Sequence, residues 1–128
     1  MDVREAMSDV VLRLGPTHTV REAAKRMTER GVGAAVIDDP DAPGPGILTE
    51  RDVLRALATG ADPDATAIGE FLTPSAVTAD PSWSLEDAAS TMLRGNFRHL
   101  VVVDGGRTVG VVSVRDLMRV RLSALPSG

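Results

Sequence analysis

Two short segments of the chain carry residue types that can do chemistry, at the same spacing. Each has a hydroxyl residue, then an arginine two positions later and an aspartate three positions later: Thr49, Arg51 and Asp52, and Ser113, Arg115 and Asp116. A hydroxyl residue at a helix start caps free backbone N–H groups, and an acid three residues later completes a capping box. The same N–H groups, together with the helix dipole, form a site for a phosphate. Both uses stay open, and one pair of side chains can serve both.

The arginine in each segment falls in the first turn of its expected helix. A basic side chain is unfavourable there, because the helix N-terminus carries a partial positive charge. An anionic partner would remove this penalty. A solvated or dimer-facing arginine is the equal alternative for Arg51 and Arg115.

The two segments occupy equivalent places in an internal repeat. A shift of 65 residues aligns Pro16 with Pro81 and Met27 with Met92, and a shift of 64 then aligns Gly46 with Gly110. One small length change within so many matches indicates a tandem duplication. We expect a first repeat at 1–58, a linker at 59–67, a second repeat at 68–122 and a frayed tail at 123–128.

Each repeat reads as an extended lead-in, a helix, two strands and a second helix. In the first repeat, a capping box at Thr19 and Glu22 opens a helix that ends near Gly31. The Ser84–Asp87 segment predicts a second capping box in the other repeat. Two strands with one open face bury too little surface alone. We therefore predict an α+β fold in which two repeats pack sheet to sheet with helices outside.

Composition excludes several classes of function. The chain has 128 residues, a net charge of -4, no cysteine and only three aromatic residues, and its basic residues are scattered. This disfavours nucleic-acid binding, and no apolar run is long enough to span a membrane. A cytoplasmic location is the default. His18 and His99 lack metal-ligand spacing with any carboxylate cluster, and no catalytic constellation is visible. We therefore expect no enzyme, no metal and no required cofactor.

The duplicated G-h-h-[ST]-x-x-D signature, at 46–52 and 110–116, resembles that of a pair of CBS domains, also called a Bateman module. Short stand-alone actinobacterial proteins of this kind look similar in length and in their linker. The resemblance implies two pseudo-twofold-related β-α-β-β-α repeats with two clefts between them that bind adenosine-containing ligands. It places Thr49 with Asp52 in one cleft and Ser113 with Asp116 in the other, against ribose and phosphate. Arg51 or Arg115 would add charge-assisted contacts.

The two clefts should differ. Arg98 and His99 precede the second strand of the second repeat, where Gly33 and Ala34 stand in the first. We expect Arg98 and His99 to line the second cleft, although a half-buried structural histidine is the alternative.

The expected function is therefore a regulatory module that senses AMP, ADP, ATP or S-adenosylmethionine and acts on a protein target in trans. The alternative is a homodimeric or partner-binding scaffold with vestigial clefts, and the resemblance implies a disc-like homodimer. The scaffold would use two apolar helix faces, Val53, Leu54 and Leu57 on one and Leu117, Met118 and Val120 on the other.

Overall fold

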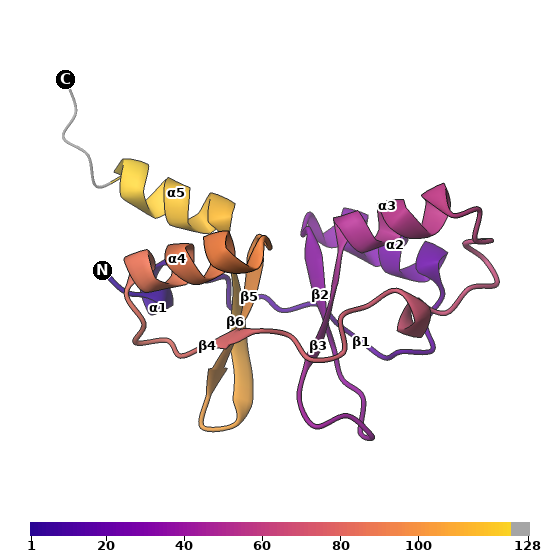
Figure 1. Cartoon of the computed structure of the whole chain (residues 1–128), viewed down its shortest axis with the longest axis horizontal. Coiled ribbons are helices and arrows are strands. Elements are labelled where there is room, and N and C mark those ends of the chain that lie inside the picture. The colour runs from indigo at the N-terminus through magenta and orange to yellow at the C-terminus, as the bar shows by residue number, and fades with distance from the viewer. Residues whose placement is uncertain (124–128) are drawn as a thin grey trace. The chain divides into compact units, whose positions relative to one another are not determined.

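The computed structural model of the chain describes residues 1–123 and contains two compact units (Figure 1). One unit is Leu12–Ala76, and the other is Met1–Val11 together with the chain from Val77 onward. Each unit contains a three-stranded sheet and helices, which confirms the predicted α+β class. Of the predicted tail, Ser123 ends the last helix, and residues 124–128 lie outside the described residues.

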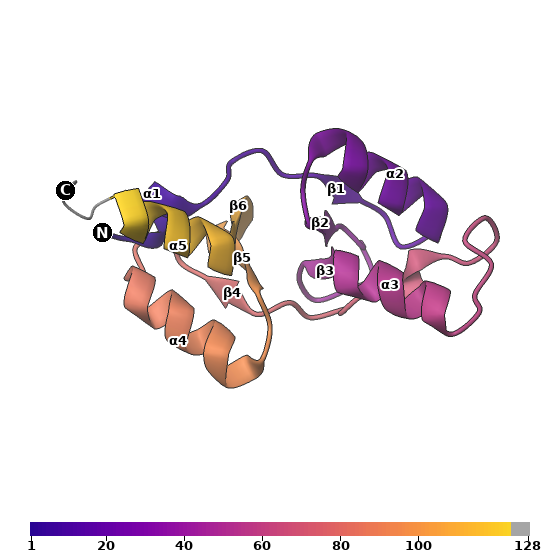
Figure 2. The ribbon, with the colours of Figure 1, turned by 90° about the horizontal axis from the view of Figure 1, so that it is seen from above.

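The Leu12–Ala76 unit has the sheet order β1-β2-β3. Strand β1 (Arg13–Leu14) is parallel to β2 (Ala34–Ile37), which is antiparallel to β3 (Gly46–Thr49). Helix α2 (Val20–Arg30) lies between β1 and β2, α3 (Glu50–Ala58) follows β3, and a short 3-10 helix, η1 (Ile68–Glu70), comes later. The two α-helices lie side by side (Figure 2).

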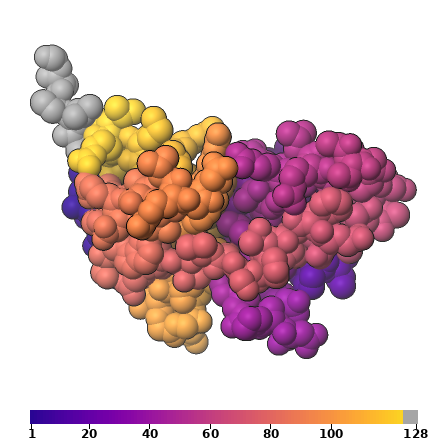
Figure 3. All heavy atoms as spheres, in the orientation of Figure 1, coloured from indigo at the N-terminus to yellow at the C-terminus, as the bar shows by residue number. Residues whose placement is uncertain are grey.

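The other unit repeats this arrangement with the sheet order β4-β5-β6. It contains α1 (Val3–Ala6), β4 (Thr78–Ala79), α4 (Leu85–Gly95), β5 (His99–Asp104), β6 (Arg107–Ser113) and α5 (Val114–Ser123). Strands β5 and β6 are joined by a tight turn in which Gly105 and Gly106 adopt φ of 58° and 80°. The ladder therefore continues to Asp104 opposite Arg107, and the end of this hairpin protrudes (Figure 3).

The repeats exchange their lead-in segments. Helix α1 belongs to the first repeat in sequence, yet Val3 N–H donates to the carbonyl of Trp83 (2.8 Å) in the unit of the second repeat. Reciprocally, η1 opens the second repeat, and Ile68 N–H donates to the carbonyl of His18 (2.8 Å). Val3 and Ile68 are both fully buried. Each compact unit therefore contains one repeat completed by the lead-in of the other.

The first glycine of each signature permits this exchange. The backbone of Ser8 pairs with Val111 in both directions, at 2.9 and 3.0 Å. A Cβ atom on Gly110 would lie 2.8 Å from the Ser8 carbonyl oxygen and 2.8 Å from Met7 Sδ. At the equivalent Gly46 it would lie 3.0 Å from the carbonyl oxygen of Thr73. The signature requires a glycine because the backbone of the other repeat's lead-in passes too close to it for a side chain.

The helix ends follow the sequence prediction in most respects. Thr19 and Glu22 form the reciprocal capping box of α2, and Gly31 ends that helix in the left-handed conformation. Asn96 does the same for α4, with φ of 57°. The predicted box at Ser84 forms only in part. The Ser84 hydroxyl accepts from Asp87 N–H, while the Ser84 backbone is bridged to Asp2 of the exchanged lead-in.

The predicted linker, residues 59–67, is part of the Leu12–Ala76 unit. Val20 N–H donates to the carbonyl of Thr66 and Arg21 N–H to that of Pro63, both at 2.9 Å. The Arg21 and Asp64 side chains form an ion pair. The linker therefore satisfies N–H groups at the start of α2 that have no partner within the helix.

Each unit has its own aliphatic core. One core contains Val3, Met92, Leu100 and Val112, and the other contains Leu14, Met27, Ile37 and Leu48. Leu117, expected on an interface face, is 7% exposed and belongs to the first of these cores. Val53 and Val120 are half-buried and also pack against their cores. The apolar side chains that remain exposed on these two helices are Leu54, Leu57, Met118 and Leu122.

Candidate functional site

The first signature lies where β3 passes into α3. Asp52 is 6% exposed, and its Oδ2 atom accepts from Thr49 N–H (2.9 Å) and from Thr49 Oγ1 (3.2 Å). Asp52 N–H donates back to Thr49 Oγ1 at 3.4 Å. The predicted cap is therefore present. One oxygen of the Asp52 carboxylate, Oδ2, faces the cap.

The second signature has the same geometry where β6 passes into α5. Asp116 Oδ2 accepts from Ser113 N–H (2.8 Å) and from Ser113 Oγ (2.9 Å), and Asp116 N–H donates to Ser113 Oγ (3.1 Å). The other oxygen of each carboxylate, Oδ1, takes no part in the cap.

Arginines one turn further along the helices face these outer oxygens. Arg119 Nη2 lies 2.8 Å from Asp116 Oδ1, whereas Arg55 Nη2 lies 3.5 Å from Asp52 Oδ1. Arg55 Nη2 also donates to the carbonyl of Phe71 at 3.4 Å. Sequence reasoning gave these arginines no role. Their identity at equivalent positions of both repeats was the available signal.

The arginines that were predicted as ligand contacts are placed differently. Arg51 and Arg115 are exposed, and within residues 1–123 their guanidinium groups make no hydrogen bond or ion pair. On the two sides of Arg51, Glu50 N–H donates to Gly33 (3.0 Å) and Asp52 N–H donates to the cap. The structure leaves both guanidinium groups accessible to an anion or to solvent.

Strand pairing brings Arg98 and His99 beside the second signature. His99 is opposite Ser113, and Val114 N–H donates to the Arg98 carbonyl at 3.0 Å. Ala34 and Gly33 hold the same positions beside Thr49 and Glu50. The predicted residues of the second signature are therefore neighbours in space, and this end of the sheet is more basic than its counterpart.

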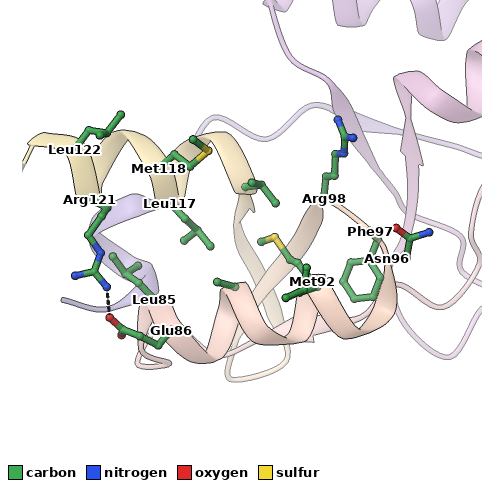
Figure 4. Close-up of a pocket in the computed structure, with 13 residues that line it drawn as sticks. Leu85, Glu86, Met92, Asn96, Phe97, Arg98, Leu117, Met118, Arg121 and Leu122 are labelled. Atoms are coloured by element: carbon green, nitrogen blue, oxygen red, sulfur yellow. Dashed lines mark hydrogen bonds and ion pairs between the residues drawn. The ribbon is translucent and has the colours of Figure 1, made fainter.

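A groove of about 580 Å³ lies between the antiparallel helices α4 and α5 (Figure 4). Leu85, Met92 and Leu117 point into it, and Arg98 lies beyond one end. The Arg121–Glu86 ion pair lies at the other end. A hydrogen bond from its own backbone N–H, and then Arg121, lower the pKa of Glu86. This groove is largely apolar and therefore differs in chemistry from the signatures.

Within residues 1–123, no three His, Cys, Asp or Glu side chains are grouped so that they could hold a metal ion. None of the helices in this part of the chain is long and apolar enough to cross a membrane.

Comparison with known proteins identifies the family. The model of the CBS domain matches residues 3–59 and again residues 68–123. The chain belongs to the CBS-domain family. It is 35% identical to the CBS domain-containing protein YhcV of Bacillus subtilis, over 90% of this chain and 81% of YhcV. It is also 35% identical to the uncharacterized protein MJ1225 of Methanocaldococcus jannaschii, over 91% of this chain but 41% of that protein.

Solved CBS structures share the fold. PAE2072 from Pyrobaculum aerophilum, complexed with AMP, has a TM-score of 0.82 and 32% identity, over 98% of this chain and all of that one (100%). The CBS domain pair of MJ0100, in complex with 5′-methylthioadenosine and S-adenosyl-L-methionine, has a TM-score of 0.84 and 26% identity, over 94% and 99%. A hexameric CBS-CP12 protein from bloom-forming cyanobacteria has a TM-score of 0.87 and 26% identity, over 92% and 66%. Binding of adenosine compounds thus occurs among CBS proteins of similar fold.

Proposed function

We propose that this chain is a non-catalytic regulatory module that binds an adenosine-containing ligand at its signature residues. AMP, ADP, ATP and S-adenosylmethionine are the candidate ligands. The observation that carries the proposal is the pair of capped carboxylates, Asp52 and Asp116, each of which keeps one oxygen outside its cap. A carboxylate in this position can accept hydrogen bonds from a ribose diol. The adenosine compounds bound by PAE2072 and by MJ0100 support the choice of ligand class.

The other predicted residues have supporting roles in this proposal. Thr49 and Ser113 hold the carboxylates, and Arg51 or Arg115 provides a charge-assisted contact to a phosphate. Arg98 and His99 give the second signature additional polar contacts. The module signals to a protein target in trans when ligand binding favours one of its conformations.

Calorimetry and thermal shift with AMP, ATP and S-adenosylmethionine test the proposal. A ligand present at about one hundred times its dissociation constant stabilises the protein by about 2.7 kcal/mol. Asp52→Asn and Asp116→Asn each keep an oxygen for the cap but remove the charge, and we expect the double variant to lose binding. Asp87→Asn is the matched control, since Asp87 lies in the same position of α4 but in no signature. Undiminished binding by the double variant would place the ligand elsewhere.

A homodimeric scaffold is the second candidate, and the groove between α4 and α5 favours it. Leu93, Met118 and Leu122 border this groove and are 84%, 58% and 61% exposed. Large apolar side chains that are exposed and grouped together are typical of interaction surfaces. A second copy of the chain is the occupant we propose, consistent with the multimeric state of the CBS-CP12 protein.

Light scattering at several protein concentrations tests the scaffold. We expect a dimer that Met118→Glu converts to a monomer, because the charge would be buried in an apolar interface. Glu29→Lys, on the exposed face of α2, is a control for a change of surface charge. If no adenosine compound binds while the dimer forms, the scaffold is the better description.

A further inference from the structure

The two signatures differ in how many acceptor positions their aspartates still offer. A carboxylate has two oxygens with about four lone-pair positions in total. In Asp116, Oδ2 already accepts two hydrogen bonds from Ser113, and Oδ1 accepts one from Arg119 at 2.8 Å. One lone-pair position of the Asp116 carboxylate, on Oδ1, therefore remains to accept a hydrogen bond. A ribose diol that donates both hydroxyl groups to this carboxylate requires two.

Asp52 offers more. Its Oδ2 accepts the same two hydrogen bonds from Thr49, but Arg55 Nη2 lies 3.5 Å from Oδ1, beyond the usual range of an N–H···O hydrogen bond. Within the described part of the chain, neither lone-pair position on Oδ1 has a close hydrogen-bond donor, and the Asp52 side chain is 9% exposed against 15% for Asp116.

The exchanged lead-in offers Arg55 a second acceptor. Arg55 Nη2 donates to the carbonyl of Phe71, which directly follows η1. At 3.4 Å this contact is also long, so the Arg55 guanidinium lies between the Phe71 carbonyl and Asp52 Oδ1 and is held closely by neither. In the other unit, α1 takes the place of η1, and within residues 1–123 the Arg119 guanidinium has its hydrogen bond with Asp116 alone.

We infer that Arg119 is a positioning residue that occupies Asp116 and closes the second signature, so that the first signature is the primary ligand site. This inference rests on the proposed function. A ligand at the second signature must displace Arg119, and Arg119 is 63% exposed, so it can move without disturbing the core. An exposed ion pair is weak, so its removal should tighten binding by only about two- to fivefold.

Titration calorimetry with AMP on single-site proteins tests the inference. Asp52→Asn isolates the second signature, and Asp116→Asn isolates the first. We expect the Asp116→Asn protein to bind AMP more tightly than the Asp52→Asn protein. In the Asp52→Asn background, Arg119→Met should tighten binding about two- to fivefold. Arg121→Met is the matched control, because it removes an ion-paired arginine from the same helix without contact with Asp116.

The outcomes separate the two proposals. Tighter binding by the Asp52→Asn protein than by the Asp116→Asn protein would overturn the inference. So would an Arg119→Met variant that binds more weakly, because the arginine would then assist the ligand. An equal effect of Arg121→Met would overturn it as well, since the cause would be general charge. Failure of the wild type and of every variant to bind AMP, ATP or S-adenosylmethionine would overturn the proposed function itself.

Discussion

Replacing Gly110 by alanine tests the exchange of lead-in segments between the repeats. The new Cβ atom would lie 2.8 Å from the Ser8 carbonyl oxygen and 2.8 Å from Met7 Sδ. Real Cβ atoms essentially never approach other atoms within 3.0 Å, and the carbonyl belongs to a backbone held by two hydrogen bonds to Val111. The segment from Met7 to Ser8 must therefore shift away from β6.

Two opposing effects set the change in the free energy of unfolding that Gly110→Ala causes. Overpacking a well-packed site costs about 1–3 kcal/mol. Loss of glycine's freedom in the unfolded chain returns about 0.4–1 kcal/mol. We expect Gly110→Ala to lower the free energy of unfolding by about 1–2 kcal/mol, or to lower the melting temperature by about 3–8 °C. Gly46→Ala should cost less, because its closest contact is 3.0 Å.

Urea unfolding, monitored by circular dichroism and by the fluorescence of Trp83, measures the free energy of unfolding of each variant. Trp83 is the single tryptophan, and its carbonyl accepts the hydrogen bond from Val3 N–H. Gly44→Ala is the control, since nothing lies within 4 Å of its Cβ position and the substitution should be neutral or stabilising. A Gly110→Ala protein as stable as the wild type would refute the packing of the lead-in against β6.

Three further predictions concern helix ends. Asn96→Gly should stabilise the protein by about 0.5–1 kcal/mol in urea unfolding, because a left-handed φ of 57° strains any residue with a Cβ atom; a loss of stability would contradict this. Thr49→Ala and Ser113→Ala should each lower the unfolding free energy by about 1 kcal/mol, and unchanged midpoints would show that the caps contribute nothing. Hydrogen bonds from Thr19, side chain first, lower the pKa of Glu22, so its contribution is present above the ordinary glutamate pKa and is lost as pH falls through the folded value. Glu22→Gln should therefore make thermal stability fall less steeply on acidification, and an unchanged profile would contradict the assignment.

Much of the fold could be predicted from the sequence because its signals are local. The capping box at Thr19 and Glu22 and the end of the helix near Gly31 each depend on neighbouring residues, and both are confirmed.

The exchange of lead-ins could not be predicted from residue patterns. The lead-in of the first repeat is much closer in sequence to β3 than to β6, yet Ser8 pairs with Val111 of β6. The choice of β6 over β3 depends on packing rather than on local preference. The same limit applies to the site. Sequence placed Asp52 and Asp116 in equivalent roles, but the different distances to Arg55 and Arg119 depend on where the guanidinium groups find other acceptors.

The reciprocal lead-ins also bear on how such a protein could have arisen. In a half-length chain with the same packing, the residue equivalent to Val3 or Ile68 would be buried only against a second copy, because each of them is buried here in the unit of the other repeat. Two identical ancestral chains could each have donated that lead-in to the other. Gene duplication would then have fused two chains that already exchanged lead-ins. The first glycine of each signature would mark the former contact between the backbones of the two chains.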